Sequence, residues 1–168
     1  MLRIRSAERP DAPLILELVR RLAEYERLVR EFPAYKPLLA GSLNDVSWVL
    51  ATREKPDGAQ AVGLAQQAVK LVPADANFWS TLGTAHYRAG EWDAAKTALE
   101  KAIEVRQKGT AYEWFFLAMT AHRRDDPMAA REQYDRAVAW TAKEKPDDPE
   151  LRRFRAETAA LLGLPAPK

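Results

Sequence analysis

Residues 77–95 read NFWSTLGTAHYRAGEWDAA, and this stretch decides the fold. Its pattern continues through Leu99 and Ala102 and then returns about 35 residues further along the chain. The corresponding pairs are Trp79 and Trp114, Leu82 and Leu117, Gly83 and Ala118, Ala95 and Ala130, Leu99 and Tyr134, and Ala102 and Ala137. Recurrence at a fixed period of this length predicts supersecondary units that bury their apolar faces by stacking on one another.

Each copy combines a W-x2-L-[GA] helix with an A-x3-[LY]-x2-A helix, and this pairing resembles the tetratricopeptide repeat of about 34 residues. Small side chains at Gly83 and Ala118 let one helix approach its neighbour, as Ala95 and Ala102 do on the return helix. The resemblance extends from residue 42 to beyond residue 162. It implies an all-α, right-handed solenoid of three antiparallel helical hairpins, flanked by an N-terminal helix and a C-terminal capping helix.

The three expected hairpins are separated by residues that commonly begin or end helices. They pair residues 42–52 with 59–71, residues 76–89 with 92–105, and residues 111–123 with 127–141. Asp126 and Asp148 directly precede Pro127 and Pro149, which is typical of an N-cap followed by proline in the first helical turn. The helix that starts at Pro149 is predicted to end near residue 162 and to cover the apolar edge of the last hairpin.

The sequence predicts two regions, an extension over residues 1–41 and a repeat domain over residues 42–168. Within the extension, an amphipathic helix is expected over residues 11–30, because its apolar residues recur at helical spacing. Its apolar face has to be buried against some other surface.

The composition excludes several classes of site. The 168-residue chain carries a net charge of +2, no cysteine and two histidines. The lack of cysteine excludes disulfides and thiolate metal sites, and two histidines leave little material for a histidine-rich metal centre. The chain contains no HExxH, GxSxG or P-loop motif, so we expect no catalytic site, metal or cofactor. No long uncharged apolar stretch indicates a signal peptide or a membrane span, and a cytoplasmic location is expected.

Three segments of the repeat region look like the tetratricopeptide tails attached to some bacterial serine/threonine protein kinases. They are residues 42–52 (SLNDVSWVLAT), 115–119 (FFLAM) and 151–157 (LRRFRAE). The Gly-rich loop, HRD and DFG motifs of the kinase itself are absent from the sequence. The chain is therefore similar to such a tail alone.

A shorter resemblance lies near the N-terminus. Residues 3–13 (RIRSAERPDAP) followed by 15–28 (ILELVRRLAEYERL) look like the opening strand and helix of GCN5-related N-acetyltransferases. This resemblance implies an alternative function, that of a remnant or accessory fragment of an acetyltransferase. The repeat resemblance implies instead a non-enzymatic scaffold that binds a protein or peptide.

One stripe of the first helix of each hairpin is predicted to line the concave groove of the array. It is found by helical spacing, opposite the inward-facing Trp79, Leu82 and His86. Its members are Val46 and Leu50 in the first hairpin, Asn77, Ser80, Thr84, Tyr87 and Arg88 in the second, and Tyr112, Phe115, Met119, His122 and Arg123 in the third. The same register places Trp48 inward in the first hairpin.

The content of this stripe leaves two interpretations open. Apolar side chains on an exposed face commonly mark an interaction surface, so the groove is expected to bind an extended peptide or a single helix of a protein partner. Alternatively, the chain's own helix over residues 11–30 covers the stripe. Nucleic acid is not expected as a partner because the net charge is small, although Arg152, Arg153 and Arg155 cluster near the C-terminus.

Overall fold

The computed structural model describes residue 27 and residues 33–165. The chain divides into two compact units, Met1–Leu38 and Leu39–Lys168, and most described residues belong to the second. The predicted helix over residues 11–30 and the acetyltransferase-like segment lie outside the described residues, apart from Arg27. Both therefore stay predictions.

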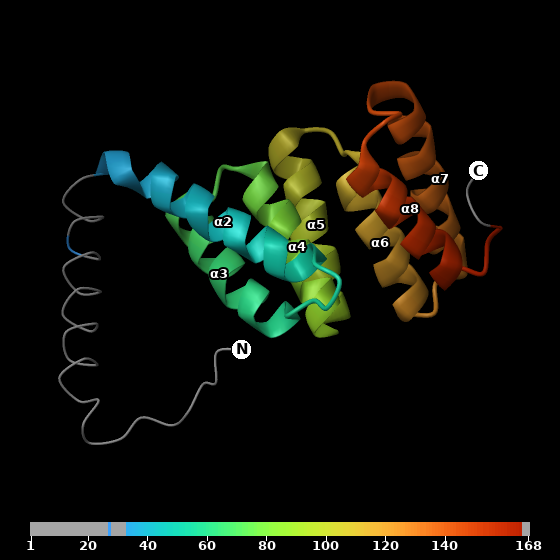
Figure 1. The fold of residues 1–168 in the computed structure, drawn as a ribbon, viewed down its shortest axis with the longest axis horizontal. Coiled ribbons are helices and arrows are strands. Elements are labelled where there is room, and N and C mark those ends of the chain that lie inside the picture. The colour runs from blue at the N-terminus through green and yellow to red at the C-terminus, as the bar shows by residue number, and fades with distance from the viewer. Residues whose placement is uncertain (1–26, 28–32, 166–168) are drawn as a thin grey trace, which may run out of the picture. The chain divides into compact units, whose positions relative to one another are not determined.

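Residues 33–165 fold into seven α-helices that follow one short 3-10 helix, η2 (Pro33–Tyr35). The α-helices are α2 (Lys36–Thr52), α3 (Gly58–Leu71), α4 (Ala76–Ala89), α5 (Trp92–Arg106), α6 (Ala111–Arg123), α7 (Pro127–Glu144) and α8 (Pro149–Leu161). They form the hairpins α2–α3, α4–α5 and α6–α7, and α8 packs against α6 and α7 (Figure 1). This arrangement confirms the predicted all-α solenoid. No helix in this described part of the chain is long and apolar enough to cross a membrane.

The helix ends follow from local capping chemistry. Asp75 begins α4 by accepting a hydrogen bond of 2.8 Å from the Asn77 amide, and Asp126 begins α7 by accepting one of 2.9 Å from the Ala129 amide. Gly90 ends α4 in the left-handed conformation, with a φ of 82°, which glycine adopts without steric cost. Helices α4 and α6 accordingly begin and end at the predicted residues.

Helix α2 is longer than the sequence predicts, since it begins at Lys36 and not at residue 42. Pro37 lies in the first turn of α2, where a missing N–H has no intrahelical acceptor to leave unpaired. The predicted boundary between residues 41 and 42 therefore falls within a continuous helix.

The core alternates small residues with large ones. A Cβ added at Gly83 would lie 2.5 Å from the Cγ of Leu99, so α5 approaches α4 as closely as the small residue predicts. In α8, Leu151 and Phe154 are fully buried while Arg152 is exposed, which gives this helix one apolar and one polar face. Full burial of a side chain of this size stabilises a fold by about 1.5–3 kcal/mol. Helix α8 therefore caps the array as predicted.

Gly58 provides a test of the packing between the first two hairpins. A Cβ added there would lie 2.4 Å from the backbone nitrogen of Ala89, an atom that moves only if α4 moves. We expect Gly58→Ala to lower the free energy of unfolding by about 1–3 kcal/mol in urea denaturation. Gly63→Ala in the same helix is the matched control, because nothing lies within 4 Å of its added Cβ. The control should raise stability by about 0.5–1 kcal/mol. Equal effects of the two substitutions would contradict this close approach.

Candidate interaction surface

The predicted stripe does not lie together on one open surface. Phe115 and Met119 are fully buried, and Thr84 is nearly so. The ring of Phe115 lies 6.1 Å from that of Tyr134 in α7, and both α6 side chains share a core cluster with Phe154 of α8. Because α7 and α8 pack on α6 there, these side chains have no open path to a partner. This corrects the expectation that Phe115 and Met119 face a groove.

The other stripe residues separate into distinct places. Asn77, Ser80 and Tyr112 line one cleft, whereas Tyr87, Arg88 and Arg123 line another. Val46 is exposed on α2, and Leu50 and His122 are half-buried. Helical spacing therefore predicted residues that line clefts, but it did not predict that they line two separate clefts.

The first surface, which we call the tryptophan cleft, has a volume of about 630 Å³. Its walls come from α2, α4, α6 and α8, together with the end of α5 and of α7. Both aromatic side chains and carboxylates line it. Residues that define its chemistry are Asp45, Trp48 and Val49 of α2, Asn77 of α4, Arg106 of α5, Tyr112 of α6, Trp140 of α7, Lys145 after α7, and Glu150 of α8.

The second surface, which we call the arginine cleft, has a volume of about 620 Å³. Its two cations already have partners within the chain. The Arg123 guanidinium lies 5.8 Å from the ring centroid of Trp92, and Arg88 Nη2 donates a hydrogen bond of 2.8 Å to Glu157. A ligand in this cleft would have to displace those contacts.

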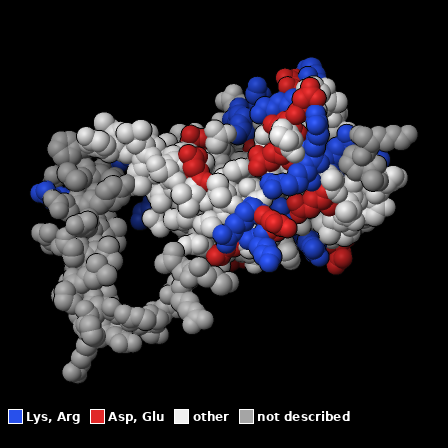
Figure 2. Space-filling view, viewed as in Figure 1, with Lys and Arg blue, Asp and Glu red and all other residues white. Residues whose placement is uncertain are grey.

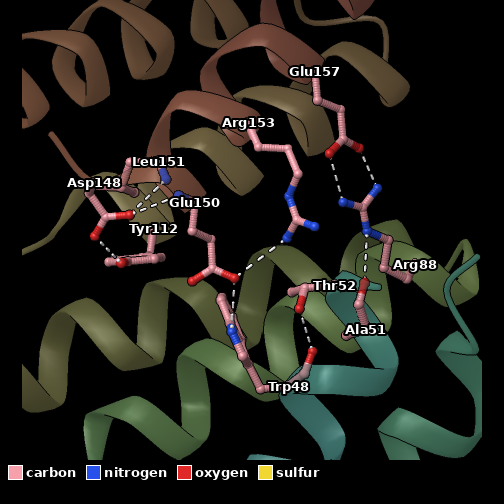
Figure 3. Close-up of polar contacts among 10 residues, drawn as sticks. All are labelled: Trp48, Ala51, Thr52, Arg88, Tyr112, Asp148, Glu150, Leu151, Arg153 and Glu157. Carbon is pink, nitrogen blue, oxygen red and sulfur yellow. Dashed lines mark hydrogen bonds and ion pairs between the residues drawn. The ribbon is translucent and has the colours of Figure 1, made fainter. Parts of the chain in front are cut away.

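Each cleft contains a contact with α8 (Figure 3). In the tryptophan cleft the contact comes from α2, and in the arginine cleft it comes from α4. Trp48 Nε1 donates a hydrogen bond of 3.1 Å to Glu150, across 102 positions of sequence. Arg88 forms a two-bond ion pair with Glu157 and also donates, through Nε, to the carbonyl oxygen of Ala51 at 3.1 Å. Helix α8 is thereby linked directly to α2 and to α4.

These contacts correct the register that was predicted for the first hairpin. The inward residues of α2 are Ser47 and Ala51, and the Ser47 hydroxyl donates a hydrogen bond of 2.8 Å to the carbonyl oxygen of Ala61 in α3. Trp48 therefore does not occupy the inward place. Its ring contacts Tyr112 at 5.9 Å and Phe154 at 6.0 Å between centroids. Apolar and polar residues are not clearly separated on the faces of α2, so the sequence did not indicate that Ser47 rather than Trp48 faces α3.

Two hydrogen-bonding groups fix the rim of the tryptophan cleft, the Tyr112 hydroxyl and the Asp148 carboxylate. The hydroxyl donates to Asp148 at 2.9 Å, and the carboxylate also caps α8 by accepting from the amides of Glu150 and Leu151. Burial alone would raise the pKa of Asp148, but these hydrogen bonds and nearby Lys145 outweigh it and lower the pKa. Burial and the facing carboxylate raise the pKa of Tyr112, which stays a protonated donor.

Asp148 makes the stability of the fold depend on pH. Because its pKa is lowered in the folded state, its contribution is present above the unfolded value of about 3.9 and is lost as pH falls below it. We expect Asp148→Asn to cost about 1 kcal/mol at pH 7, the difference between a charged and a neutral hydrogen bond, and much less near pH 3. Thermal unfolding followed by circular dichroism measures both values.

Glu150 and Asp147 complete the design of this pH experiment. Burial raises the pKa of Glu150, so its contribution has the opposite sign and is lost as pH rises. Because the Asp148 charge is one cause of that raised pKa, Asp148→Asn also relieves part of the Glu150 effect, and the measured cost is the net of the two. Asp147→Asn is the control, because its side chain is 92% exposed, and it should leave the pH profile unchanged. A constant effect of Asp148→Asn from pH 3 to 7 would contradict the assignment.

A buried ion pair holds the opposite wall of the tryptophan cleft. Glu113 is fully buried, and its carboxylate accepts from Arg106 Nη1 at 2.6 Å and from the Thr110 amide at 2.8 Å. Arg106 Nη2 also donates to the side-chain oxygen of Asn77 at 2.8 Å. The pair therefore ties the end of α5 to the first turns of α4 and α6.

Both clefts are lined by aromatic and charged side chains. Among residues 33–165, no group of three or more histidine and carboxylate side chains lies close enough to hold a metal ion. The predicted acidic doublets act at helix starts, as Asp126 and Asp148 show. Aromatic faces, paired charges and amide groups are what the clefts offer to a ligand. Sequence reasoning missed Glu150 and Arg106, because their partners lie on other helices.

Comparison with known proteins agrees with this architecture. The tetratricopeptide repeat family matches residues 49–109 and again residues 80–149, which together span more than half of the chain. The chain is also similar to the crystal structure of a thermophilic tetratricopeptide repeat protein of Thermus thermophilus, with 25% sequence identity and a TM-score of 0.55. That likeness covers 90% of this chain and 76% of the other. No curated protein matches the sequence. The finer resemblances, to kinase tails and to acetyltransferases, stay predictions. The repeated helical hairpins and both family matches show that the chain belongs to the tetratricopeptide repeat family.

Proposed function

We propose that this chain is a non-enzymatic scaffold that binds a peptide or helix of a protein partner in the tryptophan cleft. The observation that carries the proposal is the cleft itself. It is about 630 Å³ in volume and is lined by the first helices of successive hairpins, where Asn77, Ser80 and Tyr112 lie. Membership of a repeat family whose stacked units present concave binding surfaces supports the same function.

The surface beside the cleft also suits a protein partner. Val46 and Val49 on α2 are 52% and 60% exposed, which is unusual for apolar side chains at neighbouring positions of one helix. In Figure 2 the face formed by α2 is largely uncharged, while Lys, Arg, Asp and Glu intermix over α8. An apolar wall next to a mixed polar one resembles the core and rim of a protein interface.

The tryptophan cleft replaces the single long groove that the sequence predicts. Contacts of α2 and α4 with α8 interrupt the concave side, and the cations of the arginine cleft are already paired. A bound segment therefore has to be short, or it has to displace α8. Tyr87, Arg88 and Arg123, which line the arginine cleft, are therefore not part of the proposed peptide site. Phe115 and Met119 are fully buried and do not contact the peptide.

A peptide selection tests this function. Random peptides displayed on phage are selected against the purified full-length chain, and the affinity of the selected peptides is measured by fluorescence anisotropy. Val49→Trp, which fills the cleft from an exposed position, should weaken binding at least about tenfold, or 1.4 kcal/mol. Met128→Trp is the matched control, because Met128 is 85% exposed and lies away from the cleft. Selected peptides that bind both variants equally well would place the site elsewhere.

A further inference from the structure

The tryptophan cleft combines two features that together select a positively charged ligand. Three aromatic side chains line it, Trp48 from α2, Tyr112 from α6 and Trp140 from α7. Three carboxylates, Asp45, Glu113 and Glu150, line the same space. Aromatic faces attract cations through the ring quadrupole, and carboxylates attract them directly.

The basic residues of the cleft do not cancel this preference, because each already has an acidic partner. Arg106 is held by Glu113 at 2.6 Å, and that carboxylate is fully buried beneath it. Lys145 Nζ lies 3.7 Å from Asp148. These pairs are close to neutral, as is the pair of Arg153 with Glu150 at 3.5 Å, so Asp45 gives the cleft its net negative charge.

Asp45 and Glu150 each have at least one carboxylate oxygen without a strong partner among the described residues. Asp45 has no ion-pair partner among the residues that the structure describes, and the hydrogen bond that it accepts among them is a long contact of 3.5 Å from the side-chain amide of Asn44. Glu150 uses one carboxylate oxygen, Oε1, both to accept from Trp48 at 3.1 Å and to pair with Arg153 at 3.5 Å, while its second oxygen has no partner among the described residues (Figure 3). Burial raises the pKa of Glu150, which agrees with a charge that lacks a strong partner.

The chain itself shows a cation held in this way at the rim of the cleft. The Lys145 ammonium lies 5.3 Å from the centroid of the Tyr112 ring while it also meets Asp148. Two further aromatic side chains, Trp48 and Trp140, line the same cleft as Glu150 and Asp45, and Trp48 Nε1 lies 3.1 Å from Glu150. The chain supplies no basic side chain to that inner position among its described residues.

We propose that the tryptophan cleft binds an arginine side chain of the partner peptide, against its indole rings and beside the carboxylates of Asp45 and Glu150. Arginine fits better than lysine, because a planar guanidinium stacks on an aromatic ring and donates to a carboxylate in parallel. This inference rests on the proposed function, since it names the feature of the peptide that the cleft recognises.

Charge-neutral substitution on both sides of the contact tests the inference. The selected peptides are resynthesised with each arginine replaced by citrulline, which keeps the shape of the side chain and removes its charge. Binding to the full-length chain is measured by fluorescence anisotropy at low and at high salt. We expect the arginine peptides to be enriched by selection, to lose at least about tenfold in affinity with citrulline, and to weaken as salt rises.

The protein side of the experiment uses the double variant Asp45→Asn with Glu150→Gln. Glutamine keeps an acceptor for Trp48 Nε1, so the fold should be retained, and the circular dichroism spectrum checks it. This variant should weaken the arginine peptide about tenfold and leave the citrulline peptide unchanged. The control is Asp93→Asn with Glu104→Gln, which removes the same charge from side chains that are 87% and 70% exposed and lie outside the cleft. The control should bind both peptides as the wild type does.

The outcomes separate the inference from the proposed function. Peptides that bind through the cleft without arginine, or citrulline peptides that bind equally well, would overturn the inference and leave the function standing. An equal effect of the control variant would also overturn it, because the charge effect would then be general. If selection yields no peptide that depends on the cleft, both the function and the inference fail.

Discussion

Replacing Phe154 by alanine is expected to lower the free energy of unfolding by about 3–5 kcal/mol. Phe154 of α8 is fully buried, and its ring lies 5.0 Å from Phe116, 6.0 Å from Trp48 and 6.3 Å from Tyr112 between centroids. The substitution therefore removes contacts to α2 and α6 together and leaves a cavity where three elements meet. Urea denaturation followed by circular dichroism measures the loss.

Arg152 on the polar face of the same helix gives the control for this prediction. Its side chain is 60% exposed and pairs only with the exposed Asp147, so Arg152→Ala should change stability by no more than about 0.5 kcal/mol. A loss below about 1 kcal/mol for Phe154→Ala would show that α8 is not packed on the array as the structure has it.

Replacing Arg106 by alanine is expected to cost a similar amount, about 3–5 kcal/mol, for a different reason. Its partner Glu113 is fully buried, and without Arg106 the carboxylate keeps hydrogen bonds only from Thr110. An unpaired buried charge destabilises a fold far more than the pair stabilised it. Denaturant unfolding of Arg106→Ala, Glu113→Ala and the double variant measures the coupling between the two side chains.

The exposed pair of Lys101 and Glu104 is the matched control for this cycle. Its nitrogen and oxygen lie 2.8 Å apart, close to the 2.6 Å of the buried pair, but the two side chains are 40% and 70% exposed. Lys101→Ala should therefore cost no more than about 1 kcal/mol. Additive effects in the Arg106 cycle, or equal effects of Arg106→Ala and Lys101→Ala, would rule out burial as the cause.

The fold was predictable because its signals are local and repeated. The tryptophan, the small residue and the alanines recur about 35 positions apart, and several helices begin or end with local capping residues. Asp75, Gly90 and Asp126 act within a few residues of their positions in the chain. Such interactions need no knowledge of the rest of the molecule. Proline occurs both before helices and in their first turn, so Pro37 gave no clear signal and the predicted start of α2 was wrong.

The site was only partly predictable, because helical spacing gives the face of a residue but not what covers that face. Phe115 and Asn77 fall on the same predicted stripe, yet α7 and α8 bury the first and leave the second at the surface. Trp48 and Glu150 meet across 102 positions, and no sequence pattern connects them.

Local periodicity by itself thus determined the helices, their pairing into hairpins and the family of the chain. Tertiary structure alone decided that α8 also reaches α2 and α4, which stripe residues stay open, and that these residues line two clefts. The physical reason is that neighbouring helices pair through contacts that are short-range in sequence, whereas the position of α8 relative to α2 adds up the rotation from each hairpin to the next. Whether Trp48, Tyr112 and Glu150 share one site therefore depends on all three hairpins together.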